Sequence, residues 1–159
     1  MTTWADFATD EWKLVVQLPR WVVAAASCAQ QDLAYRTNHE IEAGFVASAN
    51  GRQSGNPFVS AVAAETMRVF DDRSVIASID FGDRRAAVIA VLDRVAAVNQ
   101  TVKARVGPAD AQAYRRWLVD ITDVVISAAR SGDILGFGGQ RVTPLEHSFR
   151  ELLVLTLQR

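Results

Sequence analysis

The chain lacks the features of a secreted or membrane-inserted protein. Cys28 is its only cysteine, so no disulfide can form within the chain, whereas small secreted domains usually carry paired cysteines. No apolar run reaches the roughly 18 residues that a membrane-spanning helix requires. Residues 1–10 carry acidic side chains and a tryptophan, not the basic and then apolar stretch of a signal peptide. We therefore expect a cytoplasmic protein with no membrane partner.

An excess of charge of one sign is also missing. The chain has 17 Lys and Arg against 18 Asp and Glu, a net charge of -1. Proteins that grip nucleic acid through its phosphates usually carry a basic excess, so no nucleic-acid partner is expected. The 159 residues are 50% hydrophobic and 22% charged. This composition predicts one globular domain over residues 1–159.

Residue sets that would indicate catalysis or metal binding are sparse. The two histidines, His39 and His147, stand far apart, and neither belongs to a Glu-x-x-His pair, the motif of di-iron bundles. A zinc site needs three or four spaced ligands. Cys28 lies in an alanine-rich run, where a thiol behaves as a small, inert hydrophobe. We predict no metal, no cofactor and no catalytic residues, with His39 at a solvated helix start.

Two segments show the period of an amphipathic helix clearly, residues 83–103 and residues 108–130. Gly107 and Pro108 separate them, and so short a connection predicts an antiparallel pair. The apolar stripe of the second segment consists of Tyr114, Trp117, Leu118, Ile121, Val125 and Ala128.

Helix-start signals divide the rest of the chain. Asn56 before Pro57 is an N-cap followed by a proline in the first turn, and Val59, Val62, Ala63 and Phe70 would then face inward, with Glu65 and Arg68 paired on the surface. Thr9 is expected to cap the first helix, which Pro19 either kinks or ends.

Further helices are expected over residues 38–49 and from Pro144 onward. Thr143 and Glu146 form a capping box at the start of the last helix, whose inner face would hold Leu145, Phe149, Leu152 and Leu153. Residues 75–81 fit a helix or an ordered loop, since a single strand would have no partner. The predicted fold is all-α, an irregular bundle of about six or seven helices in a single domain.

Residues 131–142 (SGDILGFGGQRV) form an unusual, glycine-rich loop between two helices. Backbone N–H groups at Gly136, Gly138 and Gly139, together with Arg141, are candidates to hold an anion. Alternatively, the glycines permit tight turns while Leu135 and Phe137 plug the end of the bundle. The loop matches neither a P-loop nor a dinucleotide-binding fingerprint.

The run from Gly132 to Glu146 (GDILGFGGQRVTPLE) resembles the C-terminal signature of a group of small bacterial helical proteins. That group also tends to have a tryptophan-containing first helix followed by proline, similar to Trp12 and Pro19 here. The resemblance implies a helical fold and no particular activity.

Tryptophan is concentrated at the start of the chain, at Trp4, Trp12 and Trp21. Trp4 and Trp12 mark an interaction surface if they are exposed, and part of the core if they cover the end of the bundle. We expect a non-enzymatic helical interaction or assembly module that associates with itself or another protein. The alternative is a helical bundle that binds an anionic small molecule through residues 132–141.

Overall fold

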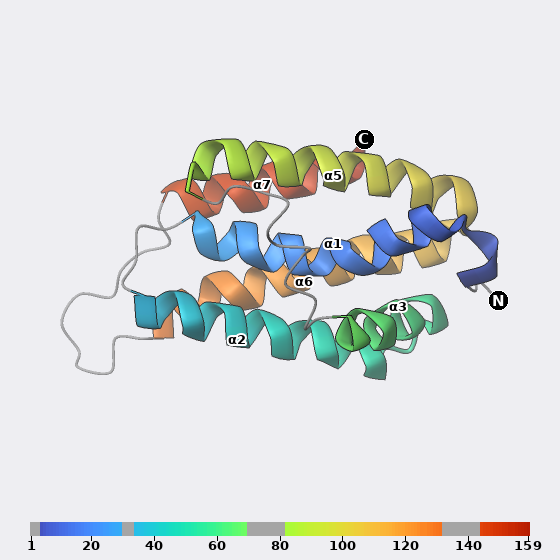
Figure 1. The fold of residues 1–159 in the computed structure, drawn as a ribbon, viewed down its shortest axis with the longest axis horizontal. Coiled ribbons are helices and arrows are strands. Elements are labelled where there is room, and N and C mark those ends of the chain that lie inside the picture. The colour runs from blue at the N-terminus through green and yellow to red at the C-terminus, as the bar shows by residue number, and fades with distance from the viewer. Residues whose placement is uncertain (1–3, 30–33, 70–81, 132–143) are drawn as a thin grey trace.

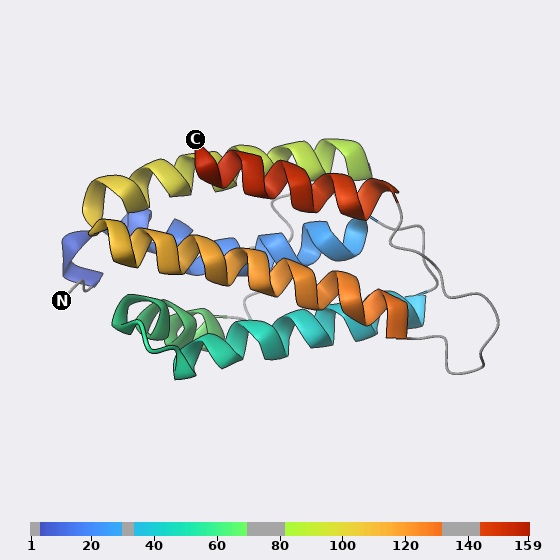
Figure 2. The same ribbon diagram turned by 180° about the vertical axis from the view of Figure 1, so that it is seen from behind.

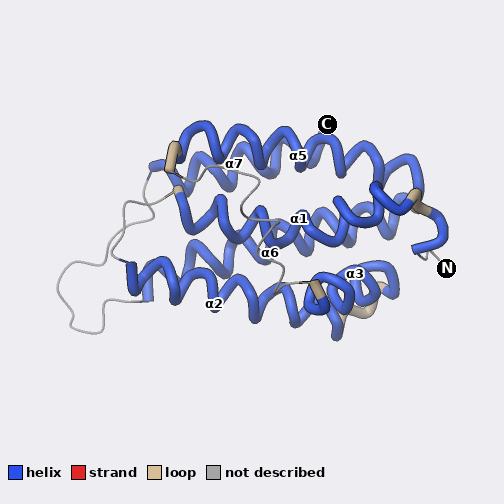
Figure 3. Tube along the Cα trace, in the orientation of Figure 1, coloured by secondary structure: helices blue, strands red, loops and turns tan. Residues whose placement is uncertain are grey.

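A computed structural model of the chain describes residues 4–29, 34–69, 82–131 and 144–159, and these residues form an all-α bundle without a strand (Figure 1, Figure 3). The α-helices are α1 (Thr9–Cys28), α2 (Ala34–Asn50), α3 (Pro57–Arg68), α5 (Arg84–Arg105), α6 (Pro108–Ser131) and α7 (Pro144–Gln158). Two short 3-10 helices, η1 (Trp4–Asp6) and η2 (Gly51–Gln53), precede α1 and α3. The predicted all-α fold is therefore confirmed, whereas residues 75–81 and Phe70 lie outside the described residues.

The helices are stacked in layers, with α1 and α6 in the middle (Figure 1, Figure 2). On one side α5 and α7 pack against this middle layer, and on the other side α2 and α3 do so. Because α1 has neighbours on both sides, residues Val15–Val23 are all buried. A helix enclosed in this way cannot keep a simple polar face.

The two clearest sequence segments form α5 and α6, an antiparallel pair joined through Val106 and Gly107 (Figure 2). Asp83 caps α5 by accepting a hydrogen bond from the Ala86 N–H at 3.0 Å. The predicted stripe of α6 is buried from Tyr114 to Val125, and Ala128 is partly buried. Local periodicity was sufficient for α6 because, unlike the middle of α1, this helix keeps an exposed side, formed by Gln112, Arg116, Asp120 and Val124.

The predicted start of α3 is also confirmed. The Asn56 side chain accepts a hydrogen bond from the Val59 N–H at 3.0 Å, and its amide donates to Asp110 of α6 at 2.8 Å. Glu65 and Arg68 form the expected surface pair. The Asn56 cap thus begins α3 and also fixes it to α6.

Pro19 neither ends α1 nor divides it in two. A proline inside a helix leaves the carbonyl four residues earlier without its N–H donor, and here that carbonyl belongs to Val15. The hydroxyl of Tyr114 donates to the Val15 oxygen at 2.8 Å. A tertiary hydrogen bond therefore replaces the missing helical one, and the helix continues to Cys28.

Two local expectations were wrong. Thr9 does not cap α1, because Ala8 is the N-cap residue and the Glu11 carboxylate accepts the Ala8 N–H at 2.9 Å. Leu152 does not face inward, although Phe149 and Leu153 do. Leu152 and Leu153 are neighbours in sequence and therefore point about 100° apart around the helix axis. Because α7 is an outer helix, only the side that carries Leu153 faces the core.

Gly44 lets α2 approach the middle layer closely. A Cβ atom at this position would lie 2.6 Å from a methyl group of Val23 in α1 and 2.8 Å from one of Val125 in α6.

No described helix is long and apolar enough to cross a membrane.

Candidate functional site

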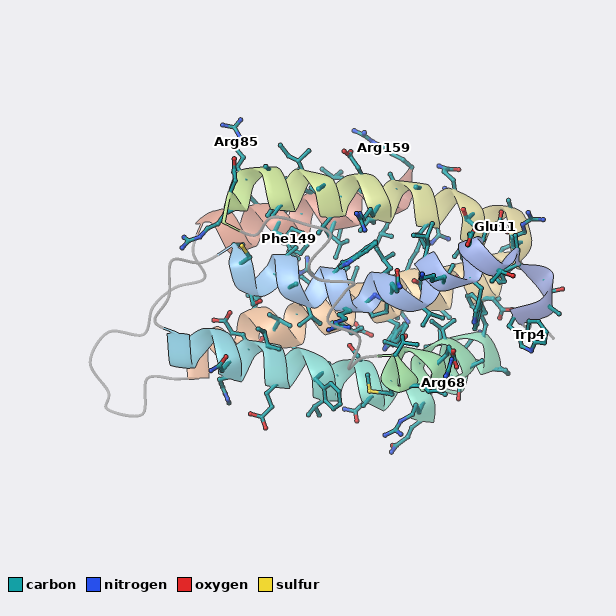
Figure 4. The ribbon with its side chains drawn as sticks, in the orientation of Figure 1. Trp4, Glu11, Arg68, Arg85, Phe149 and Arg159 are labelled. Atoms are coloured by element: carbon teal, nitrogen blue, oxygen red, sulfur yellow. The ribbon has the colours of Figure 1, made fainter. Side chains whose placement is uncertain are left out.

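The residues that the sequence singled out fall in three different situations. Gly136, Gly138, Gly139 and Arg141 lie outside the described residues. Trp4 is 70% exposed at the N-terminal end of the bundle (Figure 4). The structure therefore leaves the glycine loop a prediction, and it places Trp4 at the surface.

Trp12 belongs instead to an aromatic cluster that covers the same end of the bundle. Its ring centroid lies 5.5 Å from that of Phe7 and 6.5 Å from that of Phe58. Phe58 in turn contacts Tyr114, with centroids 5.8 Å apart. Trp12 is partly buried against the core and Trp4 is not, so the two tryptophans do not form one surface.

A cavity of about 590 Å³ opens between α2, η2, α3 and α6, and we call it the Trp117 cavity. It is lined by Ala47, Asn50, Gly51, Ser54, Val59, Ala109, Gln112, Ala113, Arg116, Trp117, Asp120 and Val124. More than half of these residues come from α6, which contributes one lining side chain on almost every turn. The walls combine small apolar groups with amide, hydroxyl and charged groups.

The indole of Trp117 forms a buried part of this wall. The residue is 7% exposed, and its Nε1 atom is buried without a hydrogen-bond partner. A Cβ atom at Gly51 would lie 2.6 Å from that nitrogen, so only glycine lets the backbone approach the ring edge. Buried indole N–H groups usually have an acceptor, but none of the described residues supplies one here.

Arg116 and Asp120 bring opposite charges to the mouth of the Trp117 cavity. Both are exposed and line it from α6, one helical turn apart. Within the described residues, neither side chain forms an ion pair with the other or with a third group. Gln112 stands one turn before Arg116 on the same line of the helix. Both charges are therefore available to a molecule in the cavity.

A second hollow, of about 500 Å³, lies between the end of α1 and the first turns of α5 and α7. Its apolar lining comes from Ala29, Val88, Ile89, Leu92, Phe149 and Leu152, with Arg84, Arg85 and Ser148 at its edge. Phe149 is buried inside the bundle, whereas Arg85 points outward from α5 (Figure 4). We call this hollow the α5–α7 groove.

Exposed aliphatic side chains continue from this groove over the surface of α5 and α7. Ile89 is 51% exposed, Leu152 44% and Leu155 53%. Arg85 and Asp93 stand one turn before and one turn after Ile89, on the same exposed side of α5. Neither of them forms an ion pair within the described residues. We call these five residues the α5–α7 face.

Cys28 lies near the groove and is half-buried. Burial raises the pKa of its thiol, and the nearby positive charge of Arg84 offsets part of that effect. A thiol in this state is mainly protonated near neutral pH and therefore a poor nucleophile. The environment of Cys28 does not resemble that of a catalytic cysteine.

The described residues contain no group of three His, Cys, Asp or Glu side chains that could hold a metal ion. His39 is exposed on α2, and the side chain of His147 is not among those described. No protein-family model matches the chain, and comparisons with curated proteins and with solved structures also find no match. Function must therefore be argued from the cavity and the face.

Sequence reasoning missed both features. Gly51 follows a helix, and nothing local indicates that it contacts Trp117, 66 positions later (117 minus 51). One signal for the face was present in the sequence, since α7 has more leucines than a single inner stripe can hold. The surplus residues, Leu152 and Leu155, are the exposed ones.

Proposed function

We propose that this protein is a non-enzymatic assembly module that associates with a second copy of itself through the α5–α7 face. The observation that carries the proposal is the exposure of Ile89, Leu152 and Leu155 beside an apolar groove. Single exposed aliphatic residues are ordinary, but a contiguous group rimmed by charges is typical of a protein interface. Such a surface gains free energy when a partner removes it from water.

The charges on α5 favour a second copy over an unrelated partner. In a two-fold symmetric dimer the same surface meets itself, so each contact occurs twice. If two α5 helices pack antiparallel with the axis at Ile89, Arg85 of each copy faces Asp93 of the other. Arg85 and Asp93 are both exposed and are equally spaced from Ile89. The face is therefore complementary to itself, because opposite charges meet at its edges and apolar side chains meet at its centre.

The aliphatic residues of α7 widen the same contact. Leu152 lines the groove together with Ile89, and Leu155 follows one turn later on α7. In the antiparallel dimer these leucines would cover the groove of the other copy. We further propose that this assembly forms in the cytoplasm, in keeping with the single cysteine.

The proposal is tested by sedimentation velocity over a series of protein concentrations. Wild-type protein should sediment as a dimer and dissociate on dilution, while Ile89→Glu should remain a monomer because it buries a charge in the apolar contact. Val46→Glu is the matched control, since Val46 is 52% exposed on α2, away from the face. A wild type that is monomeric throughout, or equal behaviour of the two variants, would contradict the proposal.

A further inference from the structure

We infer that the Trp117 cavity binds a small zwitterion with an apolar side group, that is, a free apolar amino acid. This inference is independent of self-association, because the cavity lies between α2, α3 and α6, whereas the proposed interface lies on α5 and α7. Its basis is a cavity whose wall combines small apolar side chains with two opposite charges, Arg116 and Asp120, that form no ion pair within the described residues.

The apolar part of the lining is suited to a short hydrocarbon side chain. Ala47, Val59, Ala113 and Val124 contribute small aliphatic groups from α2, α3 and α6. Small-molecule sites are typically concave and mostly apolar, with a few polar groups that fix the orientation of the ligand. A volume of about 590 Å³ falls within the usual range of roughly 300–1,000 Å³ for such sites.

The accessible positive charge on the cavity wall indicates that the ligand carries a negative group. The Nε1 atom of Trp117 does not supply this recognition, because it is fully buried and the edge of its ring faces Gly51. Arg116 lines the same wall and supplies the positive charge that a carboxylate requires.

The second charge indicates that the ligand is not a simple carboxylate. Asp120 lies one turn beyond Arg116 on α6 and also lines the cavity. A ligand with a carboxylate alone would leave Asp120 without a partner beside a negative group. A ligand that carries an ammonium group next to its carboxylate, as an α-amino acid does, matches both side chains.

The test follows the indole N–H signals of the four tryptophans by 15N-edited NMR. Trp117→Phe identifies the signal of Trp117, and alanine, valine, leucine, methionine and phenylalanine serve as probes. At least one of these amino acids should shift the Trp117 signal saturably while the Trp4 signal stays fixed. If none of them does so, the inference is wrong.

Two further measurements separate this ligand class from others. For leucine, 4-methylpentanoate lacks the ammonium group and 3-methylbutylamine lacks the carboxylate, so each should bind on the order of ten- to a hundredfold more weakly. Arg116→Gln and Asp120→Asn should each weaken leucine binding by a similar factor. Both residues are exposed, so the variants should fold normally.

Lys103→Gln and Asp10→Asn change the same charges at exposed positions outside the cavity and should bind like the wild type. Equal binding of the zwitterion and 4-methylpentanoate would overturn the assignment of Asp120. Unchanged affinity in both cavity variants would show that the amino acid binds elsewhere, and the inference would fail.

Discussion

The Trp117 cavity and the α5–α7 groove have similar volumes, about 590 and 500 Å³, but differ in chemistry. The cavity holds polar and charged groups along its wall. The groove is apolar inside, has charges only at its edge, and continues into exposed aliphatic residues. The first arrangement can orient a small polar molecule, whereas the second can only remove apolar surface from water. Volume alone therefore does not distinguish a ligand site from an interface.

The largest expected effect of a substitution is at Trp117, in the wall of the cavity. Trp117→Ala should lower the free energy of unfolding by about 3–5 kcal/mol, because it removes a large buried side chain and leaves a void. Urea unfolding measures this change. Trp4→Ala is the control and should cost less than about 0.5 kcal/mol, since Trp4 is exposed. Equal effects at the two positions would mean that the Trp117 wall is not part of the core.

A smaller effect is expected at the glycine that approaches the indole. Gly51→Ala should lower the free energy of unfolding by about 1–3 kcal/mol, because the added methyl group overpacks the site and forces the ring to shift. Gly55→Ala is the matched control, since nothing lies within 4 Å of a Cβ atom there. If the two alanine variants are equally stable, the contact between Gly51 and Trp117 is looser than described.

The smallest effect concerns Cys28, near the groove. The raised pKa of its thiol means that the reactive thiolate appears at higher pH than in an exposed cysteine. Reaction of the folded protein with Ellman's reagent near pH 8 should therefore be slower than that of the urea-unfolded chain, and it should accelerate as the pH increases. Equal rates for the folded and unfolded chains would show that Arg84 offsets burial completely, and a faster reaction of the folded protein would mean that the thiol is activated.

The sequence was sufficient for features that depend on neighbouring residues. The stripe of α6 and the Asn56 cap follow from helical period and from local hydrogen bonding. The effect of Pro19 was ambiguous because it depends on the Tyr114 hydroxyl, 95 positions later (114 minus 19), which donates a hydrogen bond to the Val15 carbonyl. Local chemistry predicts the free carbonyl, but only the packed structure shows what satisfies it.

The two candidate sites required the fold for a similar reason. The Trp117 cavity collects residues from α2, η2, α3 and α6, and no local pattern brings these together. The exposure of Leu152 depends on which helices cover α7, and periodicity cannot specify that. In contrast, Gly136 to Arg141 stood out because their local sequence is unusually rich in glycine. That they hold an anion remains a prediction.

The central claim, that the α5–α7 face pairs with itself, is tested most directly by exchanging its charges. Arg85→Asp alone should place like charges opposite each other twice in the symmetric dimer and convert the protein to a monomer in sedimentation equilibrium. Adding Asp93→Arg to the same chain should restore the dimer, because each new Asp then faces a new Arg. Failure of the double variant to recover, with the wild type dimeric, would contradict the antiparallel arrangement about Ile89.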